Sequence, residues 1–192
     1  MIHSRLKQRT TALHIALEAK LGALMSDQIS LDECAALEKK FYGFYNPIEQ
    51  QLLAIRGWDE PQLQLQSRLK LPLLVGDLAS FAINSREIAQ IPLCKSLPDL
   101  ETVAQGLGCL YVLEGSTLGG KFITAHLKKV LDLDETRGCA FFSSYGAEVG
   151  RMWSRFLAVL AAHCEKHGDD EAILNSACQT FAAMDRWFSD AA

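Results

Sequence analysis

The sequence lacks the features of a nucleic-acid-binding or membrane-spanning protein. It has no basic run, and its 19 lysines and arginines are outnumbered by 23 acidic residues, giving a formal net charge of −4. Such a chain has little means of neutralising phosphates, so neither DNA nor RNA is expected as a partner. No apolar stretch reaches the roughly 18 residues that a transmembrane helix needs, so no membrane association is expected. The N-terminal MIHSRLKQRTT carries no apolar signal core, which favours a cytoplasmic location.

Several motifs that carry well-defined chemistry are also missing. The six cysteines stand far apart without a C-x-x-C pair, and we expect them to be reduced and mostly buried. The sequence contains no H-E-x-x-H, E-x-x-H or G-x-S-x-G string, which argues against a zinc protease, a ferritin-like di-iron bundle and an α/β-hydrolase. His163 and His167, four residues apart, either bind a metal or lie in solvent and complement a helix dipole.

Residues that favour β-strands are scarce, whereas residues that favour helices are abundant. There are 6 valines and 10 isoleucines against 29 leucines and 23 alanines. Leucine and alanine lose little freedom in a helix, and β-branched side chains are stiff there. No turn signal of a β-hairpin separates alternating segments. We therefore predict an all-α protein, a single orthogonal helical bundle that spans residues 1–192.

Apolar periodicity and capping signals place the helices. A stripe of leucines at three- and four-residue spacing predicts a first helix from about residue 4 to residue 25. Ser30 and Glu33 form a capping box that opens a second helix, in which Pro47 either makes a kink or starts a new segment. Loops are expected between Pro92 and Pro98 and over residues 132–138. The remaining helical segments are predicted at residues 73–83, 99–131, 147–166 and 171–188.

His14 is the first candidate for chemistry. It lies beside Leu13 and Leu17 on the first helix, so its ring should face the interior. Glu18, one turn later, can accept a proton from Nδ1 and leave Nε2 free to bind a metal. Lys7, two turns earlier on nearly the same face, could reach an anionic group of the same ligand. The alternatives are a core histidine with a local hydrogen bond to Glu18, and an ordinary surface lysine.

The second candidate is the glycine-rich segment GCLYVLEGSTLGGKFITAHL, residues 108–127. Gly115, Gly119 and Gly120 fall inside a helical pattern, where each costs about 1 kcal/mol relative to alanine. Without Cβ atoms, this stretch can bend and touch a flat ligand directly, or it can serve a close helix crossing. GSTLGGK also resembles a phosphate-binding loop, but Phe122 stands where that motif has Ser or Thr, and no parallel sheet is expected.

Together these segments resemble the bacterial, biliverdin-producing haem oxygenases, including those paired with bacterial phytochromes. The resemblance covers nearly the whole chain. It rests on LKQRTTALHIALE, YVLEGSTLGGKFITAHL, FFSSYGAEVGRMWSRF and TFAAMDRWF.

The resemblance implies a haem held between two helices. His14 would be the axial ligand of the haem iron, and Glu18 the acidic partner of its imidazole. Lys7 would bind one haem propionate, and Arg151 and Arg155 resemble the residues that bind the second.

On the other side of the haem, the resemblance implies a bent helix that contains Gly115, Ser116, Gly119 and Gly120. In animal members this helix carries an aspartate in a G-D-L-S-G-G string, and that residue organises water in the active site. The string LEGSTLGG contains no aspartate.

The implied reaction is the cleavage of haem at a meso carbon to biliverdin, CO and Fe²⁺, using O₂ and external electrons. Haem is both substrate and cofactor, so the redox chemistry belongs to the haem and the protein positions it. The sequence shows no flavin or nicotinamide fingerprint, which implies a ferredoxin or a reductase as electron donor. A phytochrome that receives biliverdin is a further implied partner. The alternative is a haem carrier or sensor of the same fold that binds haem without turnover.

Overall fold

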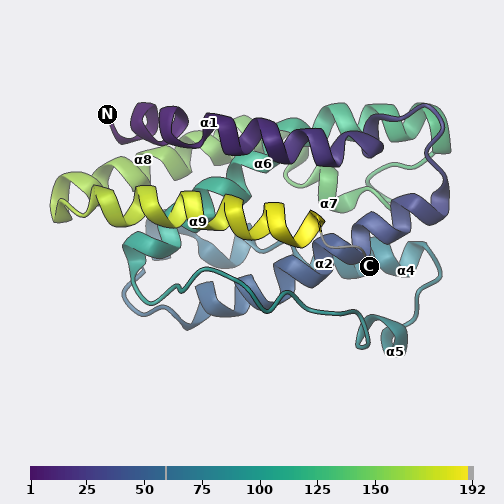
Figure 1. Cartoon of the computed structure of the whole chain (residues 1–192), viewed down its shortest axis with the longest axis horizontal. Helices are drawn as coiled ribbons and strands as arrows, with labels where there is room; N and C mark the ends of the chain where they lie inside the picture. The colour runs from purple at the N-terminus through teal and green to yellow at the C-terminus, as the bar shows by residue number, and fades with distance from the viewer. Residues whose placement is uncertain (59, 190–192) are drawn as a thin grey trace.

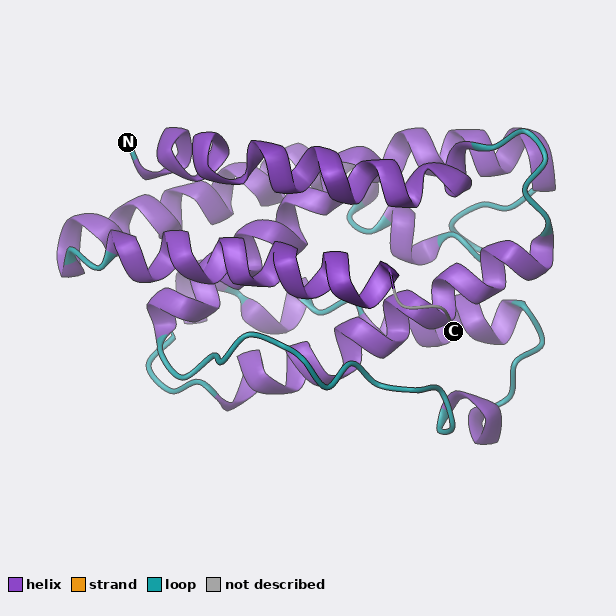
Figure 2. Ribbon diagram, viewed as in Figure 1, coloured by secondary structure: helices purple, strands orange, loops and turns teal. Residues whose placement is uncertain are grey.

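The computed structural model describes residues 1–58 and 60–189, except for the side chains of residues 60 and 61. Helices and loops make up this part of the chain, and no β-strand forms in it (Figure 2). The predicted all-α, single-domain class is confirmed. The predicted domain of residues 1–192 includes residues 59 and 190–192, which lie outside the described part.

The first two long helices follow the sequence pattern closely. Helix α1 spans Ile2–Lys20, and the expected last turn is instead a tighter 3₁₀ helix, η1, at Leu21–Met25. Helix α2 spans Leu31–Ala54 and opens on the predicted capping box of Ser30 and Glu33. Pro47 lies inside α2, so it does not start a new helix.

Short elements that the sequence pattern did not predict fill the middle of the chain. They are α3 (Glu60–Leu63), η2 (Leu65–Arg68) and α5 (Ser85–Ile88). The predicted helix at residues 73–83 is α4 (Leu71–Ser80), which starts two residues and ends three residues earlier than expected. An irregular segment that contains Pro92 and Pro98 then leads to α6, as predicted.

Helix α6, Val103–Leu131, is the longest helix of the described chain. It starts four residues later than predicted, because Thr102 and Gln105 form a capping box there. The helix continues through Gly115, Gly119 and Gly120 without interruption. A phosphate-binding loop needs non-helical backbone at residues 115–121, so that interpretation is wrong.

The last third of the chain consists of α7 (Ala140–Ser143), η3 (Gly146–Glu148), α8 (Val149–His167) and α9 (Asp170–Ser189). The two long helices agree with the predicted segments to within a few residues. Gly168, in the left-handed conformation, ends α8 and allows the chain to turn directly into α9.

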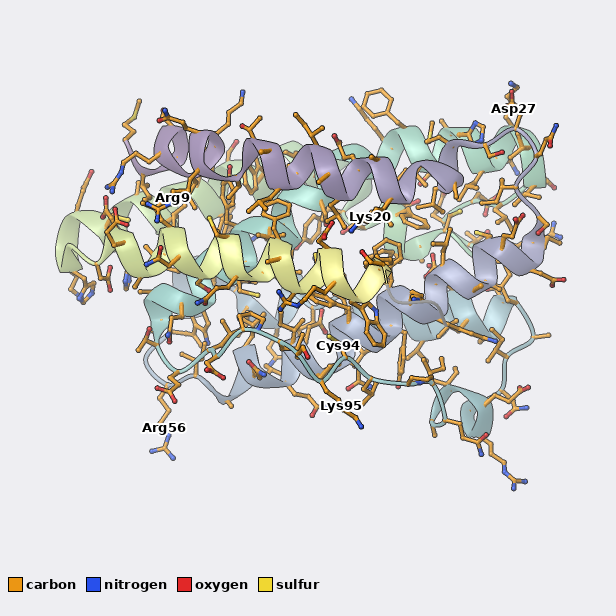
Figure 3. All side chains as sticks on the ribbon, viewed as in Figure 1. Arg9, Lys20, Asp27, Arg56, Cys94 and Lys95 are labelled. Atoms are coloured by element: carbon orange, nitrogen blue, oxygen red, sulfur yellow. The ribbon has the colours of Figure 1, made fainter. Side chains whose placement is uncertain are left out.

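Helix α9 packs against both α1 and α6 (Figure 1). Arg5 pairs with Asp170 and Glu171 at the start of α9, and Lys20 pairs with Asp185 near its end, so α1 and α9 run parallel. Arg9 and Lys20 both lie between these helices (Figure 3). In the part of the chain that the structure describes, no helix is long and apolar enough to cross a bilayer.

A fully buried carboxyl group lies in the core on α2. Glu38 of α2 has no exposed surface, and neither carboxyl oxygen has a hydrogen-bond partner among the described residues. Burial, and then the negative charge of Asp77, raise the pKa of Glu38 well above its ordinary value of 4.5. The folded protein therefore keeps this carboxyl protonated at pH values where the unfolded chain ionises it.

We expect Glu38→Gln to stabilise the protein at neutral pH and to flatten its pH dependence. Because the pKa is raised in the folded state, the wild type loses stability as pH rises above 4.5. The slope from this group is about 1.4 kcal/mol per pH unit while the folded carboxyl stays protonated. Urea unfolding from pH 5 to pH 8 measures this difference. If the free energy of unfolding of wild type and of Glu38→Gln depends on pH in the same way, Glu38 ionises normally and the prediction is wrong. Glu135→Gln, at an exposed position, is the control.

Candidate functional site

A cavity of about 830 Å³ lies between α1 and α6, with further walls from α2, α7, α8 and α9. Its size falls within the range of cofactor and small-molecule sites. Aromatic and aliphatic side chains form most of its surface, including Leu24, Phe41, Tyr111, Phe141, Phe142, Trp153, Phe181 and Met184. Met25, Leu118 and Phe122 also line it and are exposed, Phe122 by 63%. An apolar ligand would remove this surface from water.

His14 lines the cavity from α1. Its Nδ1 lies 3.3 Å from the Glu18 carboxylate, and its ring packs edge-on against Phe181 with centroids 5.9 Å apart. The side chain is 52% exposed, because it faces the open cavity and does not lie inside the core. With Nδ1–H directed at Glu18, the lone pair of Nε2 is available to a ligand. The predicted histidine–carboxylate contact is present.

Lys7 also lines the cavity from α1, and its ammonium has no ion-pair partner among the described residues. The other cations of α1, Arg5, Arg9 and Lys20, all pair with carboxylates of α9. Lys7 is therefore a positive charge available to an anionic group in the cavity. His3, one turn earlier, lines the same end and was not a sequence candidate.

The opposite wall includes Gly115, Ser116, Gly119 and Gly120 of α6. A Cβ atom on Gly119 would meet nothing within 4 Å, whereas one on Gly120 would lie 1.9 Å from the Phe142 carbonyl oxygen. Gly120 thus serves the close approach of α7 to α6, and Gly119 leaves the wall open. The explanation by close packing of the chain applies to Gly120, and contact of Gly119 with a flat ligand stays a prediction.

Gly119→Ala and Gly120→Ala should change stability in opposite directions. Alanine at position 119 meets no atoms and raises helix propensity, so we expect a gain of about 0.5–1 kcal/mol. Alanine at position 120 pushes against the α7 backbone, so we expect a loss of about 1–3 kcal/mol. Denaturant unfolding of the matched pair measures both effects. Equal effects at the two positions would contradict the different roles assigned to these glycines.

Two hydroxyl groups lie together on the cavity wall beside these glycines. The Tyr45 hydroxyl is 3.4 Å from Ser116 Oγ, and Ser116 Oγ donates to the Leu113 carbonyl at 2.8 Å. The Tyr45 hydroxyl is therefore the donor to Ser116. Burial raises the pKa of Tyr45, so its hydroxyl keeps its proton at neutral pH. Tyr45 was not a sequence candidate.

A buried charged cluster lies directly behind this wall. Glu114 of α6 forms an ion pair with Arg68, and its Oε1 accepts hydrogen bonds from Lys70 at 3.2 Å and from the Tyr145 hydroxyl at 2.7 Å. Burial lowers the pKa of Lys70, while Glu114 acts in the opposite direction and favours the ammonium form. Of this cluster, Lys70 lines the cavity. Arg68, Lys70 and Glu114 were not sequence candidates.

The two arginines predicted to bind a propionate are not among the residues that line the cavity. The Arg151 Nε donates to Glu148 at the exposed start of α8, and Arg155 is half-buried on the same helix. The structure thus brings together Lys7, His14, Glu18 and the α6 segment, but not Arg151 and Arg155. The role of these arginines stays a prediction.

The histidine pair of α8 shows a different arrangement from a metal site. The His163 and His167 rings stack with centroids 4.5 Å apart, and His163 Nε2 is 3.0 Å from the Asp169 carboxylate. Among the side chains that the structure describes, no three of His, Cys, Asp or Glu come together as a metal site.

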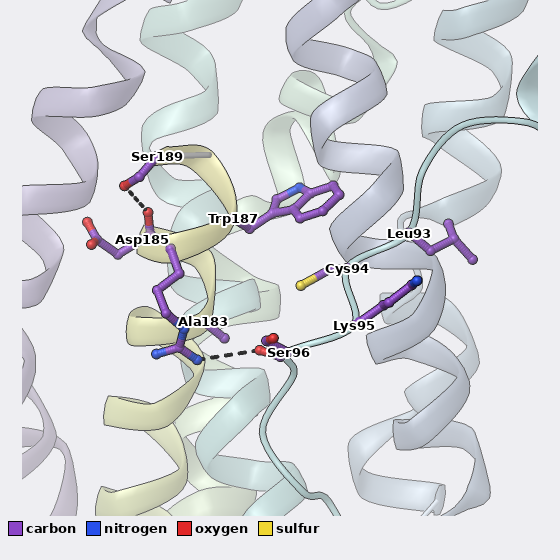
Figure 4. A pocket seen from close by; sticks show the side chains of 9 residues that line it. Leu93, Cys94, Lys95, Ser96, Ala183, Asp185, Trp187 and Ser189 are labelled. Atoms are coloured by element: carbon purple, nitrogen blue, oxygen red, sulfur yellow. Dashed lines mark hydrogen bonds between the residues drawn. The ribbon is translucent and has the colours of Figure 1, made fainter. Parts of the chain in front are cut away.

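A second pocket, of about 390 Å³, lies between the segment of Cys94 and the end of α9 (Figure 4). Arg186 spans it and donates to the Ser96 carbonyl at 3.4 Å. No residue predicted as part of a site lines this pocket, so the larger cavity is the functional candidate.

Comparison with known proteins agrees with this geometry. The family model described as "Heme oxygenase" matches residues 1–190. A heme oxygenase from Neisseria meningitidis, solved with NO and CO bound, aligns with a TM-score of 0.73 and 22% identity over 100% of this chain and 94% of that chain. A heme oxygenase from Leptospira interrogans aligns with a TM-score of 0.73 and 19% identity, covering 98% of each chain. No curated protein matches the sequence at a significant level.

Proposed function

Because the chain belongs to the haem oxygenase family, we propose that it cleaves haem at a meso carbon to biliverdin, CO and Fe²⁺, using O₂ and external electrons. The observation that carries this proposal is that His14 and Gly119 face the same large apolar cavity from two different helices. An imidazole on one side and bare backbone on the other suit a planar ligand whose metal keeps one open position.

The described residues fit a haem at this place. Nε2 of His14 is available to iron, and the contact with Glu18 fixes the orientation of the imidazole. Lys7 is the cavity-lining cation that would hold a haem carboxylate. The apolar walls cover the rest of the macrocycle, and the exposed Leu118 and Phe122 side chains become buried against it.

The wall across from His14 provides polar groups without offering a second metal ligand. Gly115 and Gly119 bear no side chain, while the hydroxyls of Ser116 and Tyr45 can hold a water molecule beside them. Because Ser116 Oγ donates its own proton to the Leu113 carbonyl, it would accept a hydrogen bond from that water and hold it on the reacting side of the haem. Haem itself supplies the oxidative chemistry, and the protein contributes position, exclusion of bulk water and this hydrogen-bonding pair.

Electrons come from outside the chain in this proposal, from a ferredoxin or a reductase, and the work takes place in the cytoplasm. A phytochrome that takes up biliverdin is the proposed recipient of the product. The electron donor is proposed because the sequence has no flavin or nicotinamide fingerprint, and the recipient is proposed from the resemblance to haem oxygenases paired with bacterial phytochromes.

The deciding experiment adds an equimolar amount of haemin and then a reductant under air. We expect a Soret band of a histidine-ligated haem, followed by its loss and the appearance of a green product that chromatography identifies as biliverdin. A haem complex that keeps its Soret band through the same treatment would instead identify a haem carrier or sensor. The absence of any specific Soret band would reject both functions.

A further inference from the structure

Lys70 is a buried cation on the wall of the cavity. Its side chain is only 3% exposed, and it precedes the first turn of α4. Lys7, the other lysine that lines the cavity, is exposed and lies on α1. Charged side chains are seldom buried to this extent unless they are paired and hydrogen-bonded. The contacts of Lys70 therefore show how its charge is stabilised and where it is directed.

Three acceptors fix the Lys70 ammonium in one position. It donates to Glu114 Oε1 at 3.2 Å, to the Tyr145 hydroxyl at 2.7 Å and to the Arg68 carbonyl. The backbone at Lys70 is fixed too, because its N–H donates to the Glu49 carboxylate at 2.5 Å. The ammonium is therefore immobile and cannot turn away into water.

The carboxylate beside Lys70 is already shared. Glu114 also forms an ion pair with Arg68 on its other oxygen, and its side chain is 2% exposed. Two buried cations thus divide the charge of Glu114, and Lys70 is the one that reaches the cavity. The negative charges of Glu49 and Glu114 both act on the Tyr45 hydroxyl, which indicates that this cluster adjoins the Tyr45 and Ser116 pair.

We propose that Lys70 makes this side of the cavity selective for small anions that bind haem iron across from His14. The inference rests on the proposed function and adds a residue that determines which ligands the site favours. A fixed charge in a water-poor cavity acts over several ångströms, because little solvent screens it and no reorganisation is needed. An anionic ligand gains from this field, whereas an uncharged ligand of similar size does not.

The test compares anionic and neutral ligands of the haem-loaded protein by optical titration. Azide and fluoride probe the ferric form, and carbon monoxide probes the ferrous form. We expect Lys70→Met to weaken azide and fluoride about tenfold or more, with carbon monoxide affinity changed less than about twofold. Lys70→Arg, which keeps the charge, should retain most of the anion affinity. Unchanged azide and fluoride affinities in Lys70→Met would overturn the proposal.

The Met variant is a fair test because the remaining contacts of the cluster are kept. Arg68 and Glu114 remain paired, and the Tyr145 hydroxyl still donates to Glu114. If Lys70→Met does not fold, Lys70→Gln removes the same charge and keeps a donor, and the same loss of anion affinity is expected of it. A wild-type protein without a histidine-ligated haem spectrum would reject the proposed function. A normal spectrum with no effect of Lys70 would reject this inference alone.

Discussion

Replacing His14 with alanine should abolish the spectrum of an imidazole-ligated haem and lower turnover by at least about 100-fold. Loss of only a residue that hydrogen-bonds to a metal ligand already costs up to about 100-fold, and here the ligand itself is lost. His14 is the histidine of the cavity wall whose Nδ1 meets a carboxylate. Without it, no imidazole reaches the iron from that side. Exogenous imidazole should restore the spectrum, because it can occupy the space that the side chain leaves.

Two variants on the same helix serve as controls for this result. Glu18→Gln keeps the axial ligand but weakens its partner, so we expect a smaller loss of haem affinity, about 10-fold. His3→Ala removes a second histidine that lines the cavity and should leave the spectrum unchanged, because His3 packs against Tyr111 and Trp153. Loss of the spectrum in His3→Ala, with the spectrum of His14→Ala intact, would show that the ligand has been misassigned.

Glu114→Gln should lower the free energy of unfolding by about 3–5 kcal/mol, since removing one partner of a buried ion pair leaves the others uncompensated. Here one carboxylate serves both Arg68 and Lys70, and all three side chains are almost fully buried. Urea unfolding of the haem-free protein gives the size of the effect. Glu135→Gln, at an exposed position, should stay within about 0.5 kcal/mol of the wild type.

A double variant shows whether the cost comes from unpaired charge. Glu114→Leu combined with Arg68→Met leaves only Lys70 without its carboxylate, whereas Glu114→Leu leaves both Arg68 and Lys70 without it, so the double variant should be more stable than Glu114→Leu alone. If the double variant is less stable by the sum of both single effects, the two residues do not interact energetically, and the pairing seen here contributes little.

The long helices were predictable because their signals are local. Ser30 and Glu33 lie three residues apart, and the leucine stripe of α1 repeats within single turns. The start of α6 was misplaced at residue 99 although Thr102 and Gln105 form the same kind of capping box. Among the short helices, α5 opens on a capping box of Asn84 and Glu87 that was missed, whereas α7 depends on a distant residue. The carboxylate of Asp77 on α4 caps α7 by accepting hydrogen bonds from the backbone N–H groups of Ala140 and Phe141 at 2.8 and 2.7 Å. Asp77 and Ala140 are 63 residues apart in the sequence.

The same distinction applies to the candidate site. The contact of His14 with Glu18 follows from their spacing on one helix, and so does the shared face of Lys7 and His14. Tyr45 and Lys70 join the cavity through contacts with α6 that span 71 and 44 residues, and periodicity carries no information about such pairs. His14 was expected to face the interior of the bundle. Its ring instead faces an open cavity and is about half exposed.

The attachment of α1 to α9 has a consequence for how a ligand enters. On one side α1 is joined to α9 by exposed ion pairs of Arg5, Arg9 and Lys20, and on the other it borders the cavity. Dissolved salt screens such pairs over a Debye length of about 8 Å at physiological concentration and about 3 Å at 1 M. Rising ionic strength should therefore loosen this helix and speed both uptake and escape of the ligand, while the buried cluster around Glu114 stays intact.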